Sequence, residues 1–239
     1  MRIAAAIPAY EAVHSVGSVV ERTKVFIDDV LVIDDGSSDG TGMAARAAGA
    51  EVHAFPGNRG KGAALNAAFS ILFARGFAAV VTIDADGQHL PEETPHLIEA
   101  ARGADLVLGT RDHLFTQMGT VRRCSNRLSS RAISWAAGQL FSDVQTGFRL
   151  YTRELIERTG FPESGFEAES AVVVRAVRLG LRVTTTPIRL GKADGRGTSH
   201  YRPVLDSLRI AAGVLRARYS TERVLEAGDA PVARSSRPD

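Results

Sequence analysis

Residues 80–89 read Val80-Val81-Thr82-Ile83-Asp84-Ala85-Asp86-Gly87-Gln88-His89, an apolar run that ends in two carboxylates. Because side chains at i and i+2 of an extended strand point the same way, Asp84 and Asp86 converge where a buried strand meets solvent. Two such carboxylates repel each other unless a cation lies between them, and Mg²⁺ or Mn²⁺ suits oxygen ligands. Since Mg²⁺ is usually shared with substrate phosphates, the motif indicates a nucleotide-activated substrate. The alternative is a solvated acidic turn, because carboxylates are mostly exposed.

On both sides of this motif, strand-like runs alternate with helix-like segments. We expect strands at residues 2–8, 29–33, 50–55, 78–83 and 105–109, with helices at 15–23, 40–48, 61–74 and after Pro91. This βαβ rhythm predicts an α/β fold, a mainly parallel sheet flanked by helices on both faces. Ligands of such sheets bind at the carboxyl ends of the strands. Tyr10, Asp35, Gly57 and Asp86 all lie just past expected strand ends.

The second half of the chain is less regular. We expect helices at residues 121–138, 168–179 and 202–218, strands at 144–151 and 182–190, and a mobile Gly-rich loop at 191–200. The helix at 202–218 has Val204, Leu205, Leu208 and Leu215 on one face and arginines elsewhere around it. That face fits either packing onto the domain or lying at an anionic bilayer, and both alternatives stay open.

Length and composition limit the class of protein. The 239 residues fit one domain at residues 1–218 followed by a polar, flexible tail at 219–239. A net charge of +2 implies no general binding of nucleic acid, and a single cysteine excludes an intramolecular disulfide. We expect neither a transmembrane helix nor a signal peptide. Arginines dominate from Arg175 onward, which fits contact with phosphates or an anionic membrane, or simply a solvated basic face.

Two further strand ends carry polar turns. Residues 34–37, Asp-Asp-Gly-Ser, suit recognition of a base or a ribose, although Ser38 or Asp39 would also cap the next helix. Residues 57–62, Gly-Asn-Arg-Gly-Lys-Gly, resemble a phosphate loop only superficially, because the spacing of a P-loop is absent. Lys61 is still expected to contact a diphosphate at a helix N-terminus.

Taken in order, these motifs resemble the inverting family 2 glycosyltransferases, which have a GT-A (Rossmann-like) fold. The resemblance rests on Pro8-Ala9-Tyr10, Asp34-Asp35-Gly36-Ser37, the Gly-Lys-Gly-Ala-Ala-Leu-Asn run at 60–66, and the Asp-Ala-Asp-Gly-Gln-His run at 84–89. Residues 109–111, 143–151 and 195–202 are similar to the dolichyl- and polyprenyl-phosphate sugar synthase branch. The resemblance covers residues 1–217. The family often has an Asn-Glu pair after the Tyr, where this chain has Glu11-Ala12.

The resemblance implies roles for the matching residues. The nucleotide would be bound by Pro8, Tyr10, Glu11, Asp34, Asp35, Lys61 and Asp84. Mg²⁺ or Mn²⁺ would be bound by Asp84, Asp86 and Gln88. The catalytic group would comprise Asp86, Arg111, Arg149, Glu167 and Glu169, with the arginines stabilising phosphate charge. The acceptor phosphate would be bound by Arg196, Ser199, His200 and Arg202.

The expected activity is sugar transfer from a nucleotide-diphosphate sugar to a polyprenyl phosphate, in the cytoplasm at the inner face of the membrane. A lipid phosphate is already an anion and needs cationic positioning, which the arginines near residues 189–202 favour. A hydroxyl acceptor would instead need a carboxylate base, for which Glu167 and Glu169 are candidates. The alternative for these two glutamates is helix N-terminal charge.

Three other classes of protein compete with this interpretation, besides transfer to a saccharide or other hydroxyl. A sugar-phosphate nucleotidyltransferase would carry a Gly-rich loop after the first strand, where this chain has Pro8-Ala9-Tyr10-Glu11. A haloacid-dehalogenase-like phosphatase would need Asp-x-Asp-x-Thr, but Gln88 stands at the Thr position. A non-catalytic nucleotide-binding protein is disfavoured because the metal, diphosphate and acceptor motifs are all present.

Overall fold

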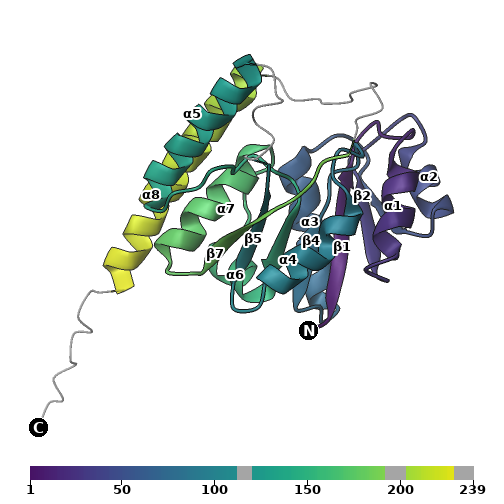
Figure 1. Cartoon of the computed structure of the whole chain (residues 1–239), viewed down its shortest axis with the longest axis horizontal. Helices are drawn as coiled ribbons and strands as arrows, with labels where there is room; N and C mark the ends of the chain where they lie inside the picture. Colours follow the sequence, from purple (N-terminus) through teal and green to yellow (C-terminus); the bar gives the residue numbers. More distant parts are fainter. Residues whose placement is uncertain (112–119, 192–202, 229–239) are drawn as a thin grey trace, which may run out of the picture.

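The computed structural model describes residues 1–111, 120–191 and 203–228, and within them the side chains of 1–111, 129–191 and 208–220. In these ranges the strands form one twisted sheet between helices (Figure 1). The strands are β1 (Ile3–Ala9), β2 (Val30–Asp34), β3 (Glu51–Ala54), β4 (Ala79–Thr82), β5 (Leu106–Thr110), β6 (Arg149–Thr152) and β7 (Val183–Pro187). The helices are α1 (Val16–Lys24), α2 (Thr41–Ala47), α3 (Lys61–Ala74), η1 (Pro91–Glu93, a 3₁₀ turn), α4 (Thr94–Ala100), α5 (Thr120–Ala137), α6 (Arg153–Thr159), α7 (Glu167–Arg178) and α8 (Pro203–Gly228).

The sheet confirms the α/β class. Among the described residues the strand order is β3-β2-β1-β4-β6-β5-β7. Of the strands that the structure describes, only β6 runs antiparallel to its neighbours β4 and β5, and the other paired strands are parallel. Because β1, β2 and β4 are parallel and adjacent, the turns that follow them meet at one carboxyl edge of the sheet.

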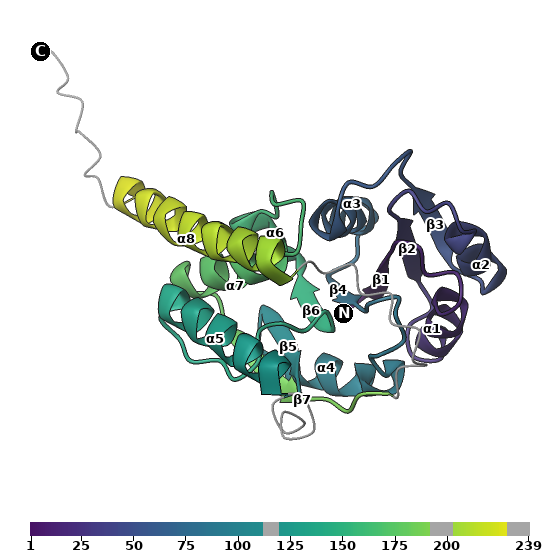
Figure 2. The same ribbon diagram turned by 90° about the horizontal axis from the view of Figure 1, so that it is seen from above.

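Two apolar cores lie on opposite faces of the sheet, and Figure 2 shows α3 and α7 on one side with α1 and α4 on the other. The first core joins Leu65 and Phe69 of α3 to Val172 of α7 and to strand residues such as Ile33. The second joins α1 and α4 to the alternate strand residues. Burial on both faces explains why β2, β4 and β5 are continuous apolar runs rather than alternating ones.

The predicted strand at residues 144–151 is wrong in its first half. The observed strand β6 begins at Arg149, and residues 144–148 form a loop. The guanidinium of Arg149 donates to the carbonyls of Val144 (2.7 Å) and Thr146 (2.6 Å), so these carbonyls face a side chain instead of a neighbouring strand. A Cβ at Gly147 would collide with the Asp84 carboxylate, so glycine lets this loop pass beside the Asp-x-Asp motif.

The last helix differs from the predicted one in length and in the face it buries. Helix α8 continues to Gly228, ten residues past the predicted end, and residues 229–239 of the predicted tail lie outside the described residues. Leu208 and Leu215 are 64% and 43% exposed, while Ile210, Val214 and Ala217 are buried. The side chains of Val204 and Leu205 lie outside the described residues. In the described part of the chain no helix is long and apolar enough to cross a membrane.

Candidate active site

The turn after β2 is tied to the start of α3 by one carboxylate. Asp35 accepts backbone N–H bonds from Arg59 (2.7 Å) and Gly60 (2.9 Å), and its own N–H donates to the carbonyl of Ala9 in β1 (2.8 Å). Burial raises the pKa of the Asp35 carboxyl, although these two hydrogen bonds oppose the rise. Asp35 therefore fixes the expected nucleotide turn and the expected phosphate loop relative to each other.

The turn after β1 is tied to the same region. Glu11 has a left-handed φ of 50°, a backbone conformation that costs energy for a non-glycine residue. Its N–H donates to the Ser37 hydroxyl (2.9 Å), and its carboxylate accepts from the N–H and hydroxyl of Ser38 (2.8 and 3.0 Å). The Asp34 carboxylate accepts the N–H of Ser37 (2.9 Å). Glu11 and Asp34 thus shape the loop, and their contact with a nucleotide stays a prediction.

Lys61, the first residue of α3, lies between two carboxylates from distant parts of the chain. Its Nζ is 2.7 Å from Asp84 Oδ1 and 2.7 Å from Glu169 Oε2, and its side chain is 16% exposed. Burial lowers the pKa of Lys61, but attraction to the two carboxylates is larger, so the pKa is raised overall. Lys61 therefore joins α3, the Asp-x-Asp turn and α7, and its contact with a diphosphate stays a prediction.

Asp84 and Asp86 have opposite electrostatic surroundings. Burial opposes ionisation of Asp84, yet the Lys61 ammonium outweighs it and lowers the pKa of Asp84 to about 2. Burial and repulsion from Asp84 raise the pKa of Asp86, whose Oδ1 accepts the N–H of Gln88 (2.9 Å). Ionising Asp86 beside the already charged Asp84 is therefore unfavourable unless a cation binds next to both carboxylates.

The donor atoms at this turn fit Mg²⁺ or Mn²⁺. Asp84, Asp86 and Gln88 offer hard oxygen ligands, which both cations prefer. No cluster of three or more His, Cys, Asp or Glu side chains suited to a metal ion occurs among the described residues. Mg²⁺ commonly takes one or two carboxylates and completes its coordination with substrate phosphate and water. The residues thus fit a cation that binds together with a diphosphate.

His89 ends the motif, and the sequence assigned it no role. Its ring is 4% exposed, and Nδ1 lies 3.8 Å from Asp84 Oδ2 without a hydrogen-bond partner among the described residues. Burial lowers the pKa of His89 to about 4, so the ring is neutral at neutral pH. Its backbone bridges to Leu190, and the N–H of Gly191 donates to the carbonyl of Gln88 (3.0 Å). The segment that leads into residues 192–202 therefore starts beside the Asp-x-Asp turn.

Arg111 follows β5 and pairs with Asp143, a second residue that sequence reasoning missed. Nε and Nη2 of Arg111 donate to the two carboxylate oxygens of Asp143 (2.8 and 3.1 Å). Nη2 of Arg111 also donates to the Gln145 carbonyl (2.5 Å). Asp143 is fully buried, and Arg111 is 11% exposed. The partners are 32 positions apart in the sequence and leave no local pattern, so only the fold reveals the pair.

Asp143 gives a testable pH dependence. Burial opposes its ionisation, but the hydrogen bonds from Arg111 lower the pKa of Asp143 below its ordinary 3.8. Because the folded pKa is lowered, the stabilisation is present above 3.8 and is lost as the pH falls below it. Asp143→Asn should cost about 3–5 kcal/mol of unfolding free energy near neutral pH, since it breaks a buried pair. Urea denaturation should show this difference from wild type shrinking as the pH falls below 3.8; a difference that is constant with pH would contradict the pairing.

Arg149 contacts Glu169, one of the two candidate glutamates, and Glu167 lies two residues earlier at the start of α7. Arg149 is 1% exposed, and its guanidinium donates to the carbonyls of Val144, Thr146 and Glu169, which places it as a positioning residue. Glu169 holds Lys61 through Oε2. Glu167 accepts the N–H of Gly165 (3.2 Å), and its Oε2 is buried without a hydrogen-bond partner in the described region. Their roles in charge stabilisation and proton transfer stay predictions.

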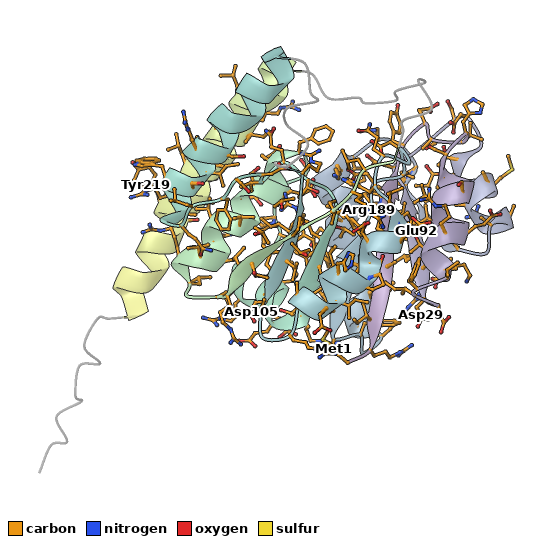
Figure 3. All side chains as sticks on the ribbon, viewed as in Figure 1. Met1, Asp29, Glu92, Asp105, Arg189 and Tyr219 are labelled. Carbon is orange, nitrogen blue, oxygen red and sulfur yellow. The ribbon has the colours of Figure 1, made fainter. Side chains whose placement is uncertain are left out.

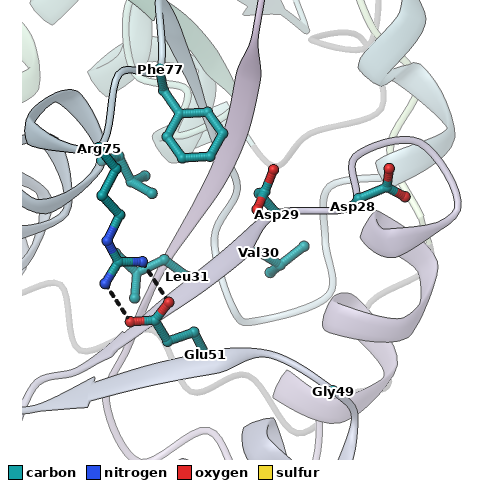
Figure 4. A pocket seen from close by; sticks show the side chains of 9 residues that line it. Asp28, Asp29, Val30, Leu31, Gly49, Glu51, Arg75 and Phe77 are labelled. Atoms are coloured by element: carbon teal, nitrogen blue, oxygen red, sulfur yellow. Dashed lines mark hydrogen bonds and ion pairs between the residues drawn. The ribbon is translucent and has the colours of Figure 1, made fainter.

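The site built from the described residues includes neither the predicted acceptor residues nor the polar pocket at the other edge of the sheet. Arg196, Ser199, His200 and Arg202, the predicted acceptor ligands, lie outside the described residues. A polar pocket lies at the opposite, amino edge of the sheet, where Arg75 forms a bidentate pair with Glu51 near Asp29 and Phe77 (Figure 4). That pocket is lined by none of the predicted site residues.

Comparisons with known proteins agree with this geometry. The family model described as glycosyl transferase family 2 matches residues 5–160, which run from within β1 to the end of α6 and include the Asp-x-Asp turn. The chain is 34% identical over 206 residues to an undecaprenyl-phosphate mannosyltransferase of Micrococcus luteus, covering 79% of this chain and 83% of that protein. It is 34% identical over 200 residues to a polyprenol monophosphomannose synthase of Mycolicibacterium smegmatis, covering 76% and 74%.

A solved structure shares the fold. Glucosyl-3-phosphoglycerate synthase of Mycobacterium tuberculosis, crystallised with Mn²⁺, UDP and phosphoglyceric acid, superposes with a TM-score of 0.69 and 22% identity, over 92% of this chain and 78% of that one. The same enzyme was also crystallised with Mg²⁺ and UDP. The GT-A fold is thereby confirmed. Since the family model matches more than half of the chain and includes the Asp-x-Asp turn, this protein belongs to glycosyl transferase family 2 and is a glycosyltransferase.

Proposed function

We propose that this glycosyltransferase moves a sugar from a nucleotide-diphosphate sugar to a polyprenyl phosphate and inverts the anomeric carbon. The observation that carries the proposal is the 34% identity, over three quarters or more of the chain, to two relatives named for undecaprenyl-phosphate and polyprenol-phosphate mannose transfer. The site geometry agrees, because it gathers carboxylates, a lysine and arginines at one edge of the sheet.

The donor nucleotide would lie over the turns after β1 and β2. Tyr10 would stack on the base, and Asp35 would accept from the base or ribose while holding the N-terminus of α3. Asp84, Asp86 and Gln88 would hold Mg²⁺ or Mn²⁺ together with the diphosphate. When bound, that cation neutralises the negative charge that develops on the leaving nucleoside diphosphate.

The chain's own residues then position the reacting groups. Lys61 keeps Asp84 ionised and in place, and Asp143 aims the Arg111 guanidinium at the same edge. The acceptor phosphate is already an anion, so it attacks the anomeric carbon without losing a proton to a base. Arg111 and the predicted ligands at 196–202 would supply the positive charge that holds it. A lipid acceptor further implies that the enzyme works in the cytoplasm, at the inner face of the membrane.

A hydroxyl acceptor is the second candidate, and one observation favours it. Glu167 Oε2 is buried without a hydrogen-bond partner in the described part of the chain, and such an atom is suited to accepting a proton. Under this alternative, Glu167 would be the base and Glu169 would remain paired with Lys61.

A donor panel tests the proposal. Radiolabelled UDP- and GDP-sugars would be incubated with the enzyme, Mg²⁺ or Mn²⁺ and detergent-solubilised undecaprenyl phosphate. We expect label from at least one donor to enter the organic phase, and chelation of the metal to stop the transfer. Label that moves only into water-soluble sugar acceptors would refute the polyprenyl-phosphate assignment.

Replacing Asp35 by Asn should weaken the donor site. The variant loses charge-assisted hydrogen bonds that are each worth about 1.5–3 kcal/mol, so the KM for the donor should rise roughly tenfold or more. The kcat should change less, because Asp35 does not touch the reacting atoms. Asp28→Asn, at the exposed amino end of β2, is the matched control and should leave KM unchanged. An unaltered KM in the Asp35 variant would remove Asp35 from the nucleotide site.

A further inference from the structure

Helix α8 has two apolar faces, and the inner one reaches the candidate active site. Ile210, Val214 and Ala217 are buried in the core that α8 shares with α7. Between them, a Cβ at Gly213 would lie 2.9 Å from Cβ of Glu167, so only glycine permits this approach. The inner face of α8 therefore packs directly on the residue that begins α7 and carries one of the candidate carboxylates.

The outer face carries a second stripe, which is exposed. Leu208, Leu215 and Tyr219 are 64%, 43% and 57% exposed, and their i, i+7, i+11 spacing sets them within about 40° of one another around the helix. We call these three residues the outer stripe. Figure 3 shows Tyr219 on the side of α8 that points away from the sheet. Helix α8 packs on α7 and α5 through its other residues, and the described elements leave these three side chains exposed.

Positive charge flanks the outer stripe. From Ser207 to Thr221 the chain has no acidic residue and three arginines. Arg209 and Arg216, seven residues apart, are both exposed on one flank. On the other flank Arg218 lies 4.6 Å over the ring of Trp135 in α5 and donates to its carbonyl (3.1 Å), and Trp135 is itself 62% exposed. Apolar, aromatic and cationic side chains thus share one surface.

We propose that the outer stripe, with Arg216, docks the enzyme on an anionic lipid bilayer. Leucines enter the acyl boundary, Tyr and Trp favour the interface, and arginines pair with anionic headgroups. A second copy of the chain fits less well, because a two-fold contact would bring like-charged arginines face to face. The inference rests on the proposed lipid acceptor. Docking through the outer stripe would place only the width of α8, roughly 10 Å, between Glu167 and the bilayer.

Vesicle co-sedimentation tests the docking surface. The full chain should bind vesicles that contain phosphatidylglycerol at low salt, and should bind pure phosphatidylcholine vesicles or high-salt samples far less. Leu208→Gln/Leu215→Gln should lower the partition coefficient roughly tenfold or more, because glutamine keeps the helix but removes the apolar anchor. Arg216→Gln should lower it about fivefold, and only on anionic vesicles. The control Val25→Gln/Met43→Gln removes two exposed apolar residues from α1's end and α2, and should bind like wild type.

The outcomes separate this proposal from the proposed function. Unchanged vesicle binding by the leucine variant, or no binding by wild type, would overturn the docking surface. So would a wild-type dimer that the leucine substitutions convert to monomers, since the stripe would then join two copies. Transfer to detergent-solubilised undecaprenyl phosphate is measured in parallel and needs no bilayer. Failure of that transfer in wild type counts against the function, whereas transfer by the leucine variant with lost vesicle binding supports the docking surface.

Discussion

Asp86→Asn is expected to lower kcat at least about 10³-fold, because a metal that stabilises the leaving diphosphate contributes several kcal/mol to the transition state. The fold should survive, since the only hydrogen bond described for the Asp86 carboxylate is the one from Gln88 in its own turn. Steady-state kinetics with the best donor of the panel measures the loss. Thermal shift measures binding: Mn²⁺ with the nucleoside diphosphate should stabilise wild type and not the variant.

A matched substitution makes this result interpretable. Asp28→Asn removes an exposed carboxylate at the opposite edge of the sheet and should retain the activity and the metal-dependent thermal shift. If Asp86→Asn kept wild-type turnover, or if wild type were fully active in a chelator, the metal site at the Asp-x-Asp turn would be disproved.

Lys61→Met is expected to lower the free energy of unfolding by about 3–5 kcal/mol, because removing one partner leaves buried charges uncompensated. Asp84 and Glu169 would then face each other without the ammonium that lies 2.7 Å from both. Adding Glu169→Gln should restore part of the loss, since it removes one of the two carboxylate charges. Urea denaturation measures both effects.

The chain offers a control lysine. Lys24 is exposed and donates to the carbonyls of Asp28 and Gly49, so Lys24→Met should cost under about 1 kcal/mol. A Lys61 variant as stable as the Lys24 variant would show that the buried network contributes nothing. A double variant no more stable than Lys61→Met would instead place the lost stability outside the pair with Glu169.

The first half of the fold was predictable because its signals are local. Buried parallel strands are continuous apolar runs, and polar turns follow them, so the sequence shows both the sheet and its carboxyl edge around Tyr10, Asp35 and Asp86. For the second half, the prediction was wrong where a side-chain hydrogen bond decided the backbone structure instead of the local sequence pattern. Val144, Thr146 and Phe148 are residues that favour strands, but the Arg149 guanidinium takes the carbonyls of Val144 and Thr146 as hydrogen-bond acceptors.

The contacts between the candidate site residues were less predictable than the motifs that contain them. Lys61, Asp84 and Glu169 were each identified from motifs, but nothing in their spacing shows that one ammonium bridges both carboxylates. Asp143 was missed because its partner, Arg111, is 32 residues away. The two faces of α8 were also ambiguous, since apolar residues surround much of the helix and only burial by α7 separates Ile210 from Leu208.

A direct comparison of two acceptors tests the central claim, that the sugar is passed to a phosphate. Undecaprenyl phosphate and undecaprenol share the same chain and differ only in the nucleophile. With a single donor, metal and detergent, we predict a kcat/KM at least roughly 100-fold higher for the phosphate, because positioned cations recognise its charge and no base is needed. Equal or faster transfer to the alcohol, lost on Glu167→Gln, would contradict the account and identify a hydroxyl-directed glycosyltransferase.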